Sequence, residues 1–171
     1  MTFVTVLFSI CAFTQENDLQ HFVNEFENEV GVWITDNSEY QNENEPYEQY
    51  AVEWKWGLGK KSLIGRLYGI KGGKDIGNFW QFRKYFDPSI TKVIVLQFGS
   101  DGSFGKGELT HLSDNEIKLE QTFTNPDGST YKIGHKTTYL DQNKHIGKSF
   151  IIDEENNWVA NRTYTWIRQQ E

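Results

Sequence analysis

Short stretches of alternating hydrophobic and polar residues follow one another from Tyr50 to Arg168, and turn residues separate them. The stretch 116–124 is the clearest, because Ile117, Leu119, Gln121 and Phe123 alternate with charged residues and a threonine. Successive side chains of a strand point to opposite faces of its sheet, so this period of two predicts strands that bury one face. No helical stretch in this region is long enough to cross over between parallel strands, so the strands are expected to be antiparallel.

Turn residues recur about every 8 to 15 residues, as in an all-β meander. Gly72-Gly73 is one such turn, and Asn125-Pro126-Asp127-Gly128 is another that predicts a hairpin. The pattern therefore predicts an all-β fold: a ten-stranded antiparallel up-and-down β-barrel over residues 31–171, closed or nearly closed. The predicted strands are 31–35, 50–56, 62–69, 78–86, 91–99, 103–111, 116–124, 129–140, 145–153 and 158–168.

Residues 15–30 have a different period. Leu19, Phe22, Val23, Phe26 and Val30 lie on one helical stripe, and acidic and amide residues lie on the other side. This spacing predicts a short amphipathic helix. A single apolar stripe must be buried against something, so we expect the helix to cap one open end of the barrel.

Residues 1–14 are apolar and uncharged, and they end in small residues. They are typical of a secretory signal peptide, with Ala12 and Thr14 at the cleavage positions, and they predict an exported protein, periplasmic or secreted. No Lys or Arg precedes Lys55, so the basic segment that usually begins such a signal is missing. Cys11 could instead be a lipoprotein acylation site, although bulky Ile10 precedes it where a small residue is preferred.

The composition of the chain argues against several classes of function. The net charge of -7 argues against a nucleic-acid partner, which requires clustered Lys and Arg. Cys11 is the only cysteine, so a cleaved chain would have no disulfide, thiol nucleophile or Cys-ligated zinc. The acidic segment 36–48 is expected to be a solvated loop, and a calcium loop is the alternative.

Several chemical motifs lack their usual context. The glycines between Gly65 and Gly77 are not followed by a helix whose N-terminus could hold a phosphate. There is also no Gly-x-Ser-x-Gly motif and no histidine pair at helical spacing. Neither a cofactor nor a metal site is therefore predicted.

Two groups of residues carry a resemblance to known proteins. Gly31-Val32-Trp33 on the first strand and Arg168 at the end of the last strand resemble the lipocalin, or calycin, arrangement, in which Trp33 would close the barrel floor and Arg168 would pack across its ring. From about Val52 to Ile167 the chain also resembles a bacterial lipocalin-like family that is known only as a domain of unknown function. That resemblance rests on 86–88, 97–102, 105–107 and 124–129. It implies the fold and no reaction.

Polar residues on faces that are otherwise apolar are the candidates for binding. We expect a ligand against His135, with Arg83, Gln97, Gln121 and Tyr131 near its polar end. Arg83 would favour an anionic or carbonyl-bearing ligand. The alternatives are a hydrogen-bonded core role for His135 and rim or exterior ion pairs for Arg83 and Arg162, because a register error of one residue reverses which way a side chain faces.

Three functions remain open. The first is a barrel that binds a small organic ligand, with no nucleic acid, no membrane insertion, and a monomeric or weakly dimeric state. The second is an isomerase-type or cyclase-type enzyme in which preorganised polar groups stabilise developing charge. The third is a haem-binding barrel of the nitrobindin type, with His111, His135 or His145 as the iron ligand.

Overall fold

A computed structural model describes residues 20–170 of the chain. The predicted signal peptide 1–14, Cys11 and the beginning of the predicted helix, with Leu19, lie outside these residues. In the described part, no helix is long and apolar enough to cross a membrane.

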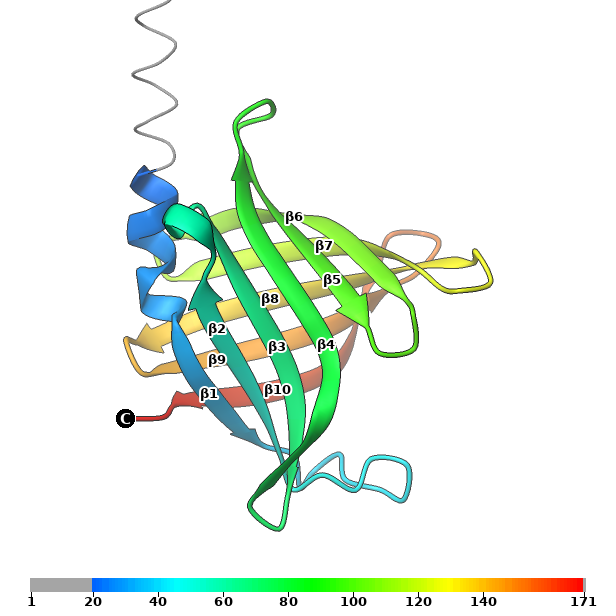
Figure 1. The fold of residues 1–171 in the computed structure, drawn as a ribbon. Coiled ribbons are helices and arrows are strands. Elements are labelled where there is room, and N and C mark those ends of the chain that lie inside the picture. The colour runs from blue at the N-terminus through cyan, green and yellow to red at the C-terminus, as the bar shows by residue number, and fades with distance from the viewer. Residues whose placement is uncertain (1–19, 171) are drawn as a thin grey trace, which may run out of the picture.

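The chain forms a closed barrel of ten strands (Figure 1). Each strand pairs antiparallel with the next one along the chain, and the first and last strands pair to close the barrel. The prediction of an up-and-down barrel is confirmed. The strands are β1 (Gly31–Asp36), β2 (Gln49–Trp56), β3 (Ser62–Lys71), β4 (Lys74–Asp87), β5 (Lys92–Gly99), β6 (Phe104–Ser113), β7 (Glu116–Thr124), β8 (Thr130–Asp141), β9 (Lys144–Ile152) and β10 (Trp158–Arg168).

The N-terminal helix covers one end of the barrel. Residues 20–26 are helical and continue into the 3-10 turn η1 (Glu27–Glu29), beside the start of β1 (Figure 1). Phe22 and Phe26 are buried, and they pack in one core cluster with apolar side chains of β3, β6 and β7. The apolar stripe of the helix therefore forms the floor of the barrel, which gives the stripe the buried surface it needs.

Trp33 and Arg168 meet where the barrel closes. Trp33 on β1 is 3% exposed, and the guanidinium carbon of Arg168 lies 4.4 Å from the centre of its ring. The Trp33 indole N–H donates a hydrogen bond to the backbone carbonyl of Glu29 at 2.8 Å. Gly31 begins this strand at φ +128°, and a side chain there would approach the Arg168 guanidinium. Glycine therefore lets the arginine lie across the ring.

The loop between β1 and β2 lies at the opposite end of the barrel from the helix (Figure 1). Asn37, the first residue of this loop, is fully buried. Its amide N–H donates to the Tyr47 carbonyl at 3.0 Å, and its side-chain oxygen accepts from the Tyr164 hydroxyl at 2.7 Å. The loop that we expected to be only solvated is therefore fastened to β10 at its base.

A β-bulge on β4 and another on β10 change which of their residues face inward. On β4, Trp80 pairs with Leu67 and Asn78 pairs with Tyr68, so Phe79 is an extra residue between them. On β10, Ala160 pairs with Phe150 and Arg162 pairs with Ser149, so Asn161 is extra in the same way. A bulge shifts the alternation of side chains by one position, and the residues on either side of it no longer follow a single period of two.

Candidate functional site

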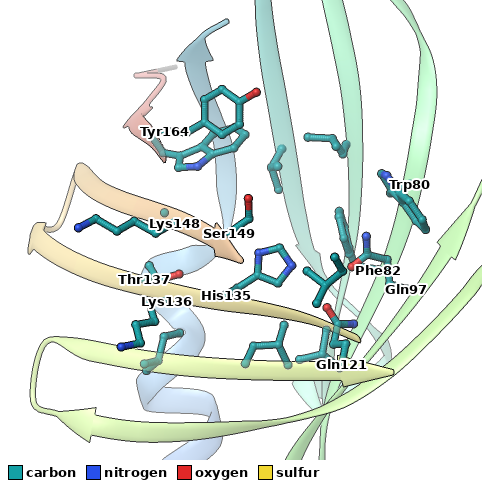
Figure 2. A pocket seen from close by; sticks show the side chains of 18 of the residues that line it. Trp80, Phe82, Gln97, Gln121, His135, Lys136, Thr137, Lys148, Ser149 and Tyr164 are labelled. Atoms are coloured by element: carbon teal, nitrogen blue, oxygen red, sulfur yellow. The ribbon is translucent and has the colours of Figure 1, made fainter. Parts of the chain in front are cut away.

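The interior of the barrel contains a cavity of about 580 Å³ that is partly open to solvent (Figure 2). This volume lies within the range of about 300 to 1,000 Å³ that is common for small-molecule sites. Aromatic side chains make up much of its wall. They are Trp33, Tyr50, Trp54, Phe79, Trp80, Phe82, Phe123, Tyr131, Tyr139, Tyr164 and Trp166. Among the polar and charged residues that also line it are Glu29, Lys84, Gln97, Gln121, His135, Thr137, His145, Ser149 and Arg162.

Four of the five residues expected at the ligand line this cavity: His135, Gln97, Gln121 and Tyr131. Arg83 does not, and its expected position is corrected. It is exposed on the outer face of β4 and pairs with exposed Ile64 of β3. The expectation counted Arg83 on the same face as Phe79, but the bulge at Phe79 puts Phe82 and Lys84 inward and Arg83 outward.

His135 lies on β8, between strands that also carry polar residues of the cavity lining. Its partners in register are Leu119 on β7 and Ser149 on β9, and Ser149 in turn pairs with Arg162 on β10. Burial lowers the pKa of the His135 imidazole to about 4, so the ring is neutral at neutral pH. A neutral imidazole offers one hydrogen-bond donor and one acceptor to a molecule in the cavity.

Gln121 is an almost fully buried polar side chain of the cavity wall. It is 1% exposed on β7, and neither atom of its amide has a hydrogen-bond partner among residues 20–170. Its side chain packs over Gly107, where an added Cβ would meet the Gln121 Cγ at 2.6 Å. A buried amide without hydrogen-bond partners costs roughly 1 to 3 kcal/mol. The Gln121 amide is therefore a place where water or a ligand in the cavity would form hydrogen bonds.

A charged cluster lies at the floor of the cavity. The Lys84 ammonium is 2.6 Å from the Glu29 carboxylate, and the Tyr139 hydroxyl donates to the other oxygen of that carboxylate at 2.8 Å. Lys84 also lies over the rings of Phe26 and Trp54, 4.4 Å and 5.0 Å from their centres. Burial and the nearby Glu29 raise the pKa of the Tyr139 hydroxyl. The sequence pattern did not point to this cluster.

His111 and His145 are the other two candidate haem ligands. His111 is not among the residues that line the cavity, and its Nε2 lies 2.8 Å from the Glu25 carboxylate of the N-terminal helix. His145 lines the cavity, with its ring centre 4.6 Å from that of Trp33. Burial lowers the pKa of His145 to about 4. No group of three or more His, Cys, Asp or Glu side chains between residues 20 and 170 is arranged to hold a metal ion.

A second charged cluster lies toward the loop end of the cavity. The two terminal nitrogens of Arg162 donate to the two oxygens of Glu45 at 2.5 Å and 2.7 Å. The Tyr50 hydroxyl donates to the same carboxylate at 2.6 Å. The hydrogen bonds from Arg162 hold the pKa of Glu45 below its usual range. Arg162 thus has the rim ion pair that we considered as its alternative role, but the bulge at Asn161 also places it on the cavity wall.

Two of the cations that line the cavity are paired with carboxylates. Lys84 is paired with Glu29, and Arg162 is paired with Glu45. Lys136 and Lys148 are also among the residues that line the cavity, but Figure 2 shows their side chains directed away from His135. The interior therefore has two neutralised ion pairs and a set of uncharged polar groups among aromatic rings.

Comparison with protein-family models and with curated protein sequences finds no match to this chain.

The neutral state of His135 predicts a pH dependence of stability. The unfolded histidine titrates near pH 6.5 and the folded one near pH 4, so between these values the unfolded state binds more protons. The free energy of unfolding is therefore not reduced by His135 above about pH 6.5, and it falls as the pH decreases from 6.5 toward 4. At about pH 5 the loss of unfolding free energy due to this histidine is about 2 kcal/mol.

Urea unfolding at pH 7 and at pH 5 measures this loss. Between these two pH values, the free energy of unfolding of His135→Gln should fall by about 2 kcal/mol less than that of the wild type. Equal losses would contradict a buried neutral His135.

Proposed function

We propose that this protein binds a small organic molecule inside the barrel, with an apolar body and a polar end. The observation that carries the proposal is the cavity of about 580 Å³ whose aromatic wall contains polar groups without internal partners, Gln121 above all. Aromatic side chains supply apolar contact area, and a few polar groups fix the orientation of a ligand. His135, Gln97 and Ser149 also line the cavity and can supply further donors and acceptors.

The first test is native mass spectrometry of protein purified from its own host. A small molecule bound at one copy per chain is expected to remain with the protein under gentle ionisation and to leave on unfolding. A purified protein that carries no such molecule, and that binds no neutral apolar dye such as N-phenyl-1-naphthylamine in a saturable way, would contradict the proposal.

A pair of matched variants locates the site. His135→Gln should weaken the binding of the co-purifying molecule about tenfold, because one hydrogen bond in the cavity is lost or misplaced. Arg83→Gln removes a long polar side chain from the outer face of β4 and should leave the affinity unchanged. Both variants should keep their melting temperatures at neutral pH within a few degrees of the wild type. Equal effects of the two substitutions would place the ligand away from His135.

A further inference from the structure

The most complete set of donors on the cavity wall surrounds a carboxylate of the chain itself. Glu45 accepts two hydrogen bonds from Arg162 and one from the Tyr50 hydroxyl, and the Asn37 amide approaches to 3.5 Å. The Glu45 side chain is 16% exposed and that of Arg162 is 32% exposed. The planar fork of an arginine binds both oxygens of a carboxylate, and a tyrosine hydroxyl adds a third donor.

These donors also line the cavity that the proposed function assigns to a ligand. Tyr50 and Arg162 are both lining residues, and Arg162 is in register with Ser149, next to His135. The ring of Phe79 lies 6.0 Å from that of Tyr50, centre to centre. A carboxylate held at Arg162 could therefore have its apolar body against the aromatic wall.

We propose that Arg162 and Tyr50 form a carboxylate-binding site at the loop end of the cavity, which Glu45 fills until the carboxylate of an organic acid replaces it. This proposal rests on the proposed function, and it defines the ligand as a carboxylic acid with an apolar body. The anionic preference first attributed to Arg83 then belongs to Arg162.

The loop can release Glu45 without losing its attachment to the barrel. Buried Asn37 holds the loop through Tyr47 and Tyr164, and its backbone N–H donates to the Glu48 carbonyl at 2.9 Å. These bonds do not involve the Glu45 side chain. Moving that side chain into water therefore leaves the base of the loop in place.

The exchange is balanced in charge. One carboxylate leaves Arg162 and another arrives, so the guanidinium is never left unpaired in the cavity. Glu45 becomes hydrated outside, and burial of the apolar body of the ligand drives the exchange. Lys84 also lines the cavity, but it is less suited to this role because it is almost fully buried between Glu29, Phe26 and Trp54.

The test compares two fluorescent probes of one shape. These are 11-(dansylamino)undecanoate, which carries a carboxylate, and its neutral carboxamide. In Glu45→Gln the competing charge is gone, so the carboxylate should bind about tenfold more tightly than in the wild type, while the carboxamide changes less than about twofold. In Arg162→Gln the carboxylate should lose its advantage over the carboxamide.

Glu48→Gln is the matched control. Glu48 lies in the same acidic loop, and its carboxylate accepts from the backbone N–H of Gly72. Its replacement should leave both affinities unchanged. If Glu45→Gln does not fold, Glu45→Asp tests the same point, because the shorter side chain no longer reaches the fork and should also favour the carboxylate probe.

The outcomes separate this inference from the proposed function. If both probes bind and neither affinity responds to Glu45 or Arg162, the barrel binds small molecules but the carboxylate site is wrong. If neither probe binds to any folded variant, both the inference and the proposed function are overturned. A carboxylate preference that increases in Glu45→Gln and disappears in Arg162→Gln supports both.

Discussion

Replacing Trp33 with alanine is expected to lower the free energy of unfolding by about 3 to 5 kcal/mol, the usual cost of removing a buried aromatic side chain. Trp33 is 3% exposed, its indole N–H donates to the Glu29 carbonyl, and the Arg168 guanidinium covers its ring. Truncation would leave a void at the floor of the cavity and remove the surface on which Arg168 lies. Urea unfolding followed by circular dichroism measures the difference.

Trp33→Phe is the matched control. It keeps most of the buried ring and loses the hydrogen bond to Glu29, so it should cost about 1 to 3 kcal/mol, the range for a buried carbonyl that loses its donor. A loss below about 1 kcal/mol for Trp33→Ala would show that this side chain is not part of the packed floor in solution.

Replacing Lys84 with methionine should also destabilise the protein by about 3 to 5 kcal/mol, because the buried Glu29 carboxylate would lose its countercharge. Lys84 is 6% exposed and Glu29 is 9% exposed, so water cannot readily take the place of the lost partner. Methionine preserves much of the length and apolar stem of lysine, which limits the effect of altered packing.

A double-mutant cycle isolates the ion pair. Glu29→Gln keeps an acceptor for the Tyr139 hydroxyl but removes the negative charge that faces Lys84. The double variant should be less destabilised than the sum of the two single variants by about 1 to 3 kcal/mol. Strictly additive losses would mean that Lys84 and Glu29 are not coupled in the folded protein.

The fold was predictable because its causes are local. The alternation in 116–124 and the turn at 125–128 each specify a strand or a hairpin by themselves, and repeating such units along the chain leads to a meander. The strand bounds differ mainly where one hairpin is tighter than expected. β4 begins at Lys74 rather than at residue 78, because Gly72 and Gly73 both adopt positive φ and allow a short turn.

The site was predictable only where the alternation is unbroken. Gln121 and His135 lie on regular stretches of β7 and β8, and counting by twos places both of them inward, as the structure does. Arg83 lies beyond a bulge, and there the same counting fails. Arg162 also follows a bulge, so the alternation before it does not show which way its side chain faces. A bulge depends on how two strands pair in three dimensions, and neither Phe79 nor Asn161 carries a local signal that marks it as the extra residue.

The two ion pairs could not be read from sequence for a different reason. Glu45 and Arg162 come from a loop and from the last strand, and Glu29 and Lys84 come from a helical turn and from β4. Each pair joins segments that are far apart in the chain and that meet only in the folded barrel. The acidic composition of 36–48 suggested solvent or calcium, and it did not single out Glu45 among the other carboxylates.

The connectivity of the barrel has a kinetic consequence. Nine of its ten strand pairings join neighbours in sequence, so most of the sheet can form by successive local hairpins. The ladder between β1 and β10 is the exception, because it requires Trp33 and Arg168 to meet across almost the whole chain. Contacts of such long sequence separation carry the largest loop-closure entropy. We therefore expect pairing of β1 with β10 to be the slowest step of folding. Arg168, which lies over Trp33 and donates to the Val30 carbonyl, stabilises this pairing once it has formed.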